Sequence, residues 1–403
     1  MLINEKTWEF VRQHADDDVR KLALQGVKDA AVDLQTALQQ IAGRQTARRK
    51  LPSWAEVDDI VYPPHLNMEQ CSSEQTARYK GKIAGEGESM VDLTGGLGVD
   101  FYWISQGFRQ RTYVEQNEQL CAISSQNFQL LGLACSVCCC DTATYLASMS
   151  HVDLIYMDPA RRNEHGGRAY GIEDCSPNVL ELLPLLMEKA NRVMLKLSPM
   201  LDWRKAVEDL KYVFEVHIVS VDNECKELLL LLSKEQSHGL RLVCVNGASS
   251  FTFIPSMGMF CSQSGNNIFP VWEYLTSSEL SASPLYLYEP NASIMKAGCF
   301  EEVGNRYAVK QVAINSHLFL SSDEIENFPG RCFRISSISS MNKQDLRAAL
   351  KGLERANISV RNFPLSVDQL RKKLKLKDGG DVYIFATTMA DGGHRLFICR
   401  KIG

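Results

Sequence analysis

The order of hydrophobic and polar positions divides the chain into a helical beginning, a middle in which strands alternate with helices, and a strand-rich end. Apolar residues recur at helical spacing up to about residue 45. From residue 89 onward, short apolar runs alternate with longer amphipathic stretches, and the runs expected to form strands are 90–93, 112–115, 135–140, 153–157 and 193–197. Strands that alternate with helices in this way predict a parallel sheet covered on both faces.

Two longer apolar runs, 212–221 and 226–232, come next and are separated by a turn at Asp222-Asn223. Because so short a connection joins antiparallel strands, we expect the sheet to end in an antiparallel hairpin. Two more short strands are expected at 240–245 and 251–254. The stretch after them is rich in Ser, Gly and Asn, which predicts a domain boundary.

The rest of the chain reads as two small α+β units. In the last one we expect strands and helices in mixed order, with a capping-box pattern formed by Ser366 and Gln369. Its expected strands are 331–338, 358–363, 381–387 and 394–400, and its expected helices are 343–355 and 366–374. The chain is therefore expected to have four parts, which are residues 1–68, 69–255, 284–330 and 331–403.

Positive charge is concentrated at the C-terminal end. Residues 331–403 carry 15 Lys and Arg against 6 Asp and Glu, a net charge of +9, whereas the whole chain carries −4. Such asymmetry predicts a polyanionic partner, and the alternative is a solvated basic surface without a partner. The best candidates for phosphate contacts are Arg371, Lys372 and Lys373, which share one expected helix.

The cysteines indicate reduced thiols. There are thirteen, and Cys138, Cys139 and Cys140 are adjacent, so on a strand they would point to alternate faces and make a poor disulfide framework. We expect a cytoplasmic protein with neither signal peptide nor membrane span. Cys135 and Cys138 form a C-x-x-C pattern, but the sequence has no second C-x-x-C pattern to complete a zinc site. We also expect these cysteines to lie in a buried strand, so we expect no metal.

A glycine-rich turn follows the first expected strand, in the segment Asp92-Leu93-Thr94-Gly95-Gly96-Leu97-Gly98-Val99-Asp100. Glycines let the backbone approach a ligand where a Cβ would collide. The dinucleotide pattern G-x-G-x-x-G is incomplete, because Phe101 occupies the place of its third glycine. Asp92 lies inside the strand, where an acid suits a cationic ligand, such as the amino and sulfonium groups of S-adenosylmethionine, better than a pyrophosphate.

Two further acids follow the next two expected strands. Glu115 lies 17 residues after Gly98 and is placed to accept hydrogen bonds from ribose hydroxyls. Asp141 follows the cysteine-rich strand and is a candidate to accept the adenine amino group. Together with Asp92, they would lie at the carboxyl ends of successive strands, where ligands bind in such sheets. The alternative for each is an ordinary helix cap.

The glycine turn, the ordered acids and the hairpin resemble class I S-adenosylmethionine-dependent methyltransferases over about residues 70–235. That resemblance implies a Rossmann-like α/β fold whose seven-stranded sheet has its last strand inserted antiparallel. The chain is more similar still to bacterial methyltransferases with a C-terminal THUMP-like domain. The segments that carry this similarity are SSEQTARYKGKIA (72–84), DLTGGLGVD (92–100), MDPARR (157–162), YLYEPNASIMKAG (286–298) and the basic end.

This second resemblance implies a methyltransferase domain at 69–255, preceded by a helical region, and S-adenosylmethionine as the cofactor. A ferredoxin-like unit would occupy 284–330 and a THUMP-like domain 331–403. Because THUMP domains elsewhere bind RNA, it also suggests RNA as the partner of the basic end. The implied cofactor contacts include Thr94, Gly95, Gly96, Gly98 and Asp100 in the turn, and Gln75 and Thr76 in a helix over the methionine end.

The segment after the fourth expected strand bears on the methyl acceptor. Methyltransferases of exocyclic base amines usually have Asn or Asp, then Pro, Pro and an aromatic residue that stacks on the base. Here Asp158 and Pro159 are followed by Ala160 and Arg161, which disfavours a base amine as the acceptor. Arg161 and its neighbour Arg162 are candidates for phosphate contacts, or they are surface arginines.

One set of four charged residues resembles the Lys-Asp-Lys-Glu tetrad of RNA 2′-O-ribose methyltransferases in its order along the chain. These residues are Lys80, Asp158, Lys196 and Glu227. A ribose hydroxyl is a weak nucleophile, so a lysine with a lowered pKa would assist its deprotonation. In this interpretation Lys196 is the base, and Asp158 and Glu227 orient it. The alternative is that Lys196 extends to solvent and Glu227 pairs with Lys226 or water.

Taken together, the sequence predicts an enzyme that transfers a methyl group from S-adenosylmethionine to RNA, either tRNA or rRNA. It predicts no metal and no membrane partner. Two other functions stay open. In the first alternative, the chain is a methyltransferase of proteins or small molecules, and its basic end is an interaction module. In the second, it is a non-catalytic RNA-binding protein that keeps the cofactor fold.

Overall fold

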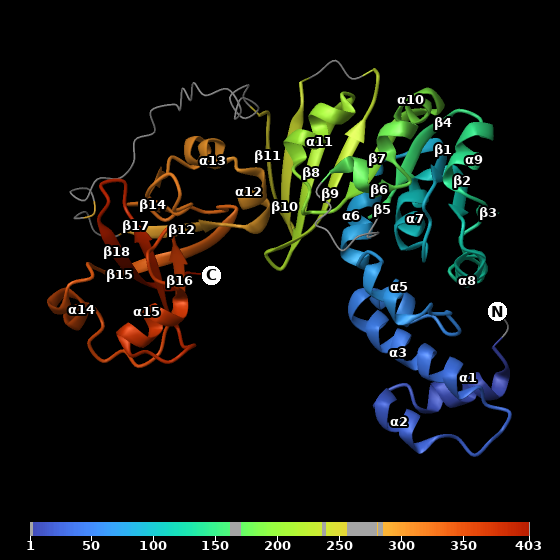
Figure 1. Ribbon diagram of the computed structural model, residues 1–403, viewed down its shortest axis with the longest axis horizontal. Helices are drawn as coiled ribbons and strands as arrows, with labels where there is room; N and C mark the ends of the chain where they lie inside the picture. Colours follow the sequence, from blue (N-terminus) through green and yellow to red (C-terminus); the bar gives the residue numbers. More distant parts are fainter. Residues whose placement is uncertain (1–2, 162–170, 236–238, 256–279, 281–284, 403) are drawn as a thin grey trace. The chain divides into compact units, whose positions relative to one another are not determined.

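The computed structural model describes residues 3–161, 171–235, 239–255, 280 and 285–402 (Figure 1). It contains two compact units. The first comprises residues 1–216 and 227–240, and the second comprises residues 217–226 and 241–403. The division crosses one β-hairpin, to which both units contribute.

The first unit begins with helices, as predicted. These are α1 (Glu5–Gln13), α2 (Val19–Gln25), α3 (Leu34–Lys50), α4 (Pro52–Ala55) and α5 (His65–Gln70). The side chains of Asn4, Asp18 and Asp33 cap the first three by accepting backbone N–H groups of the first turn, which have no partner inside the helix. Their apolar faces share a core that includes Trp8, Ile41 and Trp54.

The predicted parallel sheet is present. Its strands are β1 (Gly87–Asp92), β2 (Phe108–Glu115), β3 (Ser136–Cys139), β4 (Val152–Met157) and β7 (Ala190–Leu197), in the order β3-β2-β1-β4-β7. Helices lie on both faces of this sheet (Figure 1). They are α6 (Glu74–Ala84), α7 (Val99–Ile104), α8 (Glu118–Leu130), α9 (Thr142–Ser148), α10 (Val179–Lys189) and α11 (Trp203–Leu210), with short 3-10 turns η1 (Ser105–Gly107) and η2 (Ile172–Asp174).

The hairpin also forms as predicted. Strand β9 (Glu224–Leu232) pairs antiparallel with β7 and lies between β7 and β8 (Val213–Val221). Asp222 and Asn223 in the turn between them have φ values of 51° and 62°, as a two-residue hairpin turn of type I′ requires.

The strand count of the sheet differs from the prediction. Two more strands, β10 (Arg241–Asn246) and β11 (Ser249–Phe253), continue it beyond β8, so that it has nine strands rather than seven. The physical reason is that β8 would otherwise be an edge strand with unpaired backbone groups. The expectation of a buried cysteine strand is also wrong, because β3 is the opposite edge strand and Cys139 on it is exposed.

The second unit holds a seven-stranded sheet in the order β13-β14-β12-β15-β18-β17-β16. The two expected C-terminal units therefore share one sheet. Its elements are β12 (Tyr286–Pro290), α12 (Ala292–Ala297), α13 (Phe300–Tyr307), β13 (Lys310–Gln311), β14 (Phe319–Ser321), β15 (Gly330–Ser339), α14 (Lys343–Ala349), β16 (Asn357–Arg361), α15 (Val367–Leu374), β17 (Val382–Thr388) and β18 (His394–Ile402).

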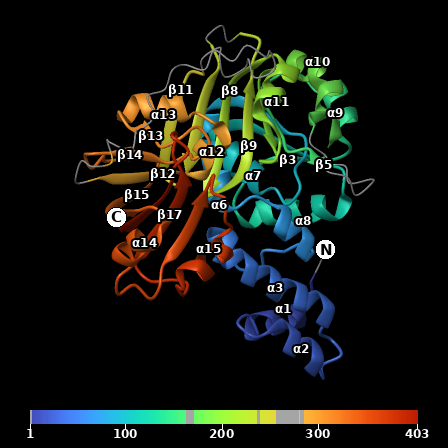
Figure 2. The same ribbon diagram turned by 60° about the vertical axis from the view of Figure 1, so that its left-hand side comes forward.

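Helices α14 and α15 lie beside β15 to β18 (Figure 2) and pack on one face of the sheet, where Leu370 and Ile384 are buried. The other face has its own core around Phe333 and Phe385. The predicted capping box of Ser366 and Gln369 is confirmed. The helix expected over 343–355 is shorter and ends at Ala349.

The close approach of α6 to α7 gives a test of the packing in the first unit. A Cβ at Gly81 would lie 2.6 Å from the carbonyl oxygen of Trp103, a backbone atom that cannot rotate away. We expect Gly81→Ala to lower the free energy of unfolding by about 1–3 kcal/mol, measured by urea denaturation, although alanine is the better helix former. Gly239→Ala is the control, because no atom lies within 4 Å of that site, and equal stability of the two variants would contradict this packing.

Candidate active site

The turn between β1 and α7 is built so that its glycines are required. A Cβ at Gly95 would lie 2.1 Å from the ring of Tyr113, and one at Gly98 would lie 2.4 Å from the ring of Phe128. Gly98 also has a φ of +79°, a backbone conformation that side chains disfavour. These rings hold the loop against the sheet and leave its backbone as the surface toward a ligand.

Glu115 is tied to the same turn. Its carboxylate accepts the backbone N–H of Gly96 at 2.8 Å and that of Asn117 at 2.8 Å. The carbonyl oxygen of Gly96 in turn accepts the hydroxyls of Tyr113 and Ser124. The ends of β1 and β2 are therefore locked together, with a carboxylate at the position predicted for ribose binding.

Asp92 lies at the end of β1 and is almost fully buried. Its carboxylate accepts the backbone N–H of Thr94 at 2.9 Å, and the hydroxyl oxygen of Thr94 accepts the backbone N–H of Asp158 at 2.6 Å. Among the described residues, no cation pairs with Asp92. Burial, and then the nearby charges of Asp100, Asp158 and Glu115, raise the pKa of Asp92 well above its ordinary value. A bound cation would relieve this repulsion.

Behind the turn lies a buried charge network centred on Lys80. The Lys80 ammonium lies 2.6 Å from a Glu227 oxygen, 3.0 Å from an Asp100 oxygen and 3.0 Å from the Ser72 hydroxyl. Asp100 also accepts hydrogen bonds from Ser72 and from the Tyr156 hydroxyl, at 2.8 and 2.7 Å. The network joins α6, α7, β4 and β9 beneath the turn.

The two carboxylates of this network respond differently to it. Burial opposes ionisation of Asp100, but the charges of Lys80 and Lys196 outweigh it and the pKa of Asp100 lies below its ordinary value. For Glu227, burial outweighs Lys80, and its pKa lies above the ordinary value. The Lys80 ammonium thus pairs with two carboxylates, of which Asp100 ionises more readily and Glu227 less readily than usual.

The four residues of the tetrad resemblance separate into two pairs. Lys80 pairs with Glu227, and Lys196 pairs with Asp158, whose carboxylate is about one-third exposed. Burial would lower the pKa of Lys196, but Asp158, Asp100 and Glu227 raise it above its ordinary value. The expectation of a lowered pKa for Lys196 is therefore wrong in this structure, because three carboxylates surround the ammonium.

The outer candidates for cofactor contacts differ in how they are held. Asp141 is exposed and caps α9 through the backbone N–H of Thr144 at 2.9 Å. Hydrogen bonds from the side chain and then the backbone of Thr144 lower the pKa of Asp141. Gln75 is exposed on α6, whereas Thr76 is buried and bonds to Ser73 at the start of that helix. Their contacts with a cofactor stay predictions.

The predicted phosphate contacts also differ. The backbone of Arg161 lies in β5 (Ala160–Arg161), which pairs with β6 (Cys175–Ser176), and Arg162 lies outside the described residues. Arg371 bonds to the carbonyl oxygen of Ala356 and to Asp378, so its guanidinium is engaged inside its own unit. Lys372 and Lys373 are exposed on α15.

The sequence pattern does not indicate two residues of the network. Ser72 lies in the segment 72–84, where its only visible feature is its position next to a helix start. Tyr156 reads as one more apolar residue of β4, and nothing in the pattern shows that its hydroxyl reaches Asp100. Both became visible only through contacts between distant elements.

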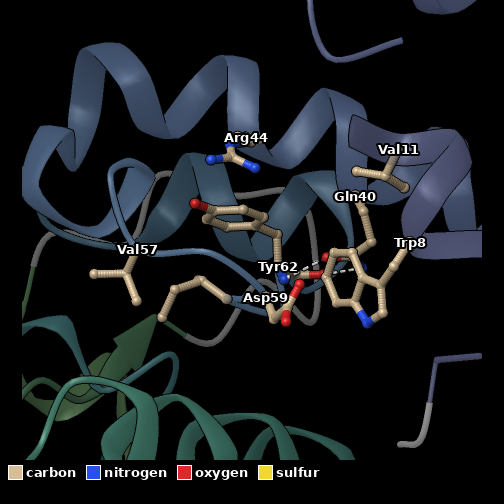
Figure 3. A pocket seen from close by; sticks show the side chains of 8 residues that line it. Trp8, Val11, Gln40, Arg44, Val57, Asp59 and Tyr62 are labelled. Atoms are coloured by element: carbon tan, nitrogen blue, oxygen red, sulfur yellow. Dashed lines mark hydrogen bonds between the residues drawn. The ribbon is translucent and has the colours of Figure 1, made fainter. Parts of the chain in front are cut away.

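A small cavity lies elsewhere in the first unit, among its N-terminal helices (Figure 3). Its volume is about 10 Å³, enough for roughly one water molecule. Figure 3 shows Tyr62 between Arg44 and Trp8, with its backbone bonded to Gln40. Burial raises the pKa of Tyr62 to about 12, and the cavity is too small for a nucleotide.

In the part of the chain that the structure describes, no group of three or more His, Cys, Asp or Glu side chains is arranged to hold a metal ion. None of its helices combines the length and the apolar character that crossing a membrane would need.

Comparison with known proteins decides the family. A solved structure from Porphyromonas gingivalis W83, classed as a methyltransferase, is 32% identical, and the match covers 100% of both chains with a TM-score of 0.86. The chain belongs to this methyltransferase family. Within the methyltransferase, a ferredoxin-like domain family matches residues 286–329 and a THUMP domain-like family matches residues 330–401.

More distant matches share only part of the methyltransferase. A class I S-adenosylmethionine-dependent methyltransferase from Listeria monocytogenes is 10% identical over 60% of this chain and 94% of that chain, with a TM-score of 0.37. TrmK from M. capricolum, solved with S-adenosylhomocysteine, is 12% identical over 40% of this chain and 68% of that chain, with a TM-score of 0.32. Scores this low carry no argument about function. No curated protein matches the methyltransferase.

The unpaired charge of Asp92 gives a test of the site. In Asp92→Asn, the amide oxygen can still accept the Thr94 N–H, while the buried charge is removed. We expect the free energy of unfolding of the ligand-free protein at pH 7 to rise by about 1–3 kcal/mol in urea denaturation. We expect affinity for S-adenosylmethionine to fall about tenfold or more, by calorimetry. A variant that bound the donor as the natural protein does would show that Asp92 is not part of the site.

Proposed function

We propose that this enzyme binds S-adenosylmethionine at the carboxyl ends of β1, β2 and β3 and transfers its methyl group to an RNA. The observation that carries the proposal is the surplus of acids around the glycine turn. Among the described residues there, two lysines, Lys80 and Lys196, pair with three of five carboxylates. The five carboxylates are those of Asp92, Asp100, Glu115, Asp158 and Glu227. Such a site favours a cation over a dinucleotide phosphate.

The donor matches this electrostatic need in two places. Its sulfonium and ammonium charges would lie near Asp92 and Asp100, and its ribose hydroxyls would bond to Glu115. Asp141 remains the candidate for the adenine amino group. The backbone of Gly95, Gly96 and Gly98, together with Thr94, would line the donor, and Gln75 and Thr76 would lie over its methionine end.

On the acceptor side, the pair of Lys196 and Asp158 is the candidate machinery. A protonated Lys196 suits holding Asp158 and an acceptor oxygen better than removing a proton. Asp158 is partly exposed, so it would receive a proton or a hydrogen bond from the acceptor. Lys80 and Glu227 would position this pair electrostatically, because the charge of Glu227 acts on the Lys196 ammonium. The acceptor atom stays open.

Support for RNA comes from the C-terminal part. The family match to a THUMP-like domain and the net charge of +9 over residues 331–403 both fit a tRNA or an rRNA. We take 69–255 as the catalytic part and 331–403 as the RNA-binding part. Lys372 and Lys373 would contact phosphates, as would Arg161 and Arg162 near the acceptor.

The acceptor is tested by mass spectrometry of nucleosides from cells with and without the gene. We expect one methylated nucleoside of tRNA or rRNA to disappear without the gene, and to reappear when the purified enzyme and S-adenosylmethionine are added to that RNA. Unchanged RNA, together with methylated protein or small molecules in the same extracts, would contradict an RNA acceptor.

Lys196 separates donor binding from methyl transfer. In Lys196→Ala, Asp158 loses its cation, so we expect transfer to fall about 100-fold or more while S-adenosylmethionine still binds in calorimetry. Lys226→Ala is the control, because Lys226 is largely exposed and pairs with Glu224. Full transfer activity in Lys196→Ala would remove this lysine from the mechanism.

A further inference from the structure

A second polar cluster lies in the C-terminal unit, where Glu289 joins two strands that are far apart in the sheet. Its carboxylate accepts the Arg331 Nε at 2.8 Å and the Arg361 Nη2 at 2.8 Å. Glu289 is on β12 and Arg361 is on β16, with β15, β18 and β17 between them in the sheet order. The sheet must therefore curl so that β16 approaches β12 across the core around Phe333.

Arg361, which bonds to Glu289, and two other residues of this unit carry buried polar atoms that have no hydrogen-bond partner among the described residues. They are Arg361 Nε, Thr387 Oγ1 and His317 Nδ1. Thr387 is fully buried and lies opposite Arg361 in the register of β16 and β17. His317 stacks on Phe300 at 4.3 Å, and its pKa is lowered by burial and then by the charge of Arg361. Unpaired buried polar atoms are costly unless something satisfies them.

The charge of this cluster points to an anion. Two guanidinium groups share one carboxylate, which leaves a net charge of +1 and several N–H donors that do not bond to Glu289. Both arginine side chains are more than one-third exposed, whereas Glu289 is buried. A buried carboxylate that holds two partly exposed arginine side chains orients them in the planar geometry that binds phosphate.

We propose that Glu289, Arg331 and Arg361, here the Glu289 cluster, bind a backbone phosphate of the RNA acceptor. The inference rests on the proposed function for its choice of RNA. Arg331 and Arg361 contact phosphate oxygens with the N–H groups that do not bond to Glu289. The Glu289 cluster differs from the lysines of α15, which lie on the helix that packs on the other face of the sheet.

The test removes the charges together, because Glu289 alone would be left buried and unpaired. The triple variant Glu289→Gln, Arg331→Gln and Arg361→Gln changes the net charge by −1. Arg347→Gln is the matched control, since Arg347 is exposed on α14 and its replacement changes the charge by the same amount. Binding of unfractionated tRNA by the full chain is measured by fluorescence anisotropy at several salt concentrations.

We expect the triple variant to bind tRNA about tenfold more weakly than the natural protein, with the control unchanged. The slope of log affinity against log salt should fall by about one for each phosphate that the variant no longer binds. Equal affinity and slope in the triple variant and the control would overturn the proposal. Displacement of tRNA by submillimolar inorganic phosphate would also overturn it, because the site would then take free phosphate.

A second variant covers loss of folding. Arg361→Lys keeps the charge and the ion pair but not the planar fork, so we expect an intermediate loss of tRNA affinity at an unchanged melting temperature. Affinity equal to that of the natural protein would mean that only charge matters and would overturn the phosphate fork. Either variant should bind S-adenosylmethionine as the natural protein does.

The two proposals fail in different ways. If tRNA binding depends on the Glu289 cluster but no RNA is methylated, the RNA acceptor is wrong and the cluster stands. If RNA is methylated with an unchanged KM by the triple variant, the cluster is wrong and the proposed function stands.

Discussion

Asp92 is a carboxylate that the fold buries without giving it a counter-ion, and the candidate site depends on this constraint. β1 lies between β2 and β4, so the end of β1 is flanked by a strand on each side. Lys80 and Lys196 are already engaged by other carboxylates. The free site therefore has a negative electrostatic potential that is not neutralised, and this potential favours the binding of a cationic ligand.

The surrounding structure keeps this arrangement rigid. Rings of Tyr113 and Phe128 fill the space that side chains at Gly95 and Gly98 would take, so the turn cannot relax toward the sheet. Beneath it, Lys80 bridges Asp100 and Glu227 and thereby fixes α6, α7 and β9 to one another. Preorganised charge of this kind does not need to rearrange when the ligand enters.

Much of the site could be predicted because it follows from topology. In a parallel sheet, residues that end successive strands meet at one edge, so Asp92, Glu115 and Asp141 could be placed from strand order alone. Which lysine forms an ion pair with which carboxylate could not be predicted. The sequence shows on which elements Lys80 and Lys196 lie, but whether each meets Asp100, Asp158 or Glu227 depends on side-chain directions set by packing. Strands β10 and β11 were predicted as strands, but their place in the same sheet beyond β8 was not. Like the link from Glu289 to Arg361, it depends on long-range pairing that no local pattern records.

The central claim is tested most directly by comparing two ligands that differ in the sulfonium charge. S-adenosylmethionine and the sulfonium-free S-adenosylhomocysteine are titrated into the enzyme by calorimetry at several pH values. Because the sulfonium charge favours the ionised form of Asp92, whose pKa is raised in the free enzyme, we predict that S-adenosylmethionine gains more affinity than S-adenosylhomocysteine as the pH rises. Equal affinity of the two compounds at every pH, or tight binding of NAD in their place, would contradict the account.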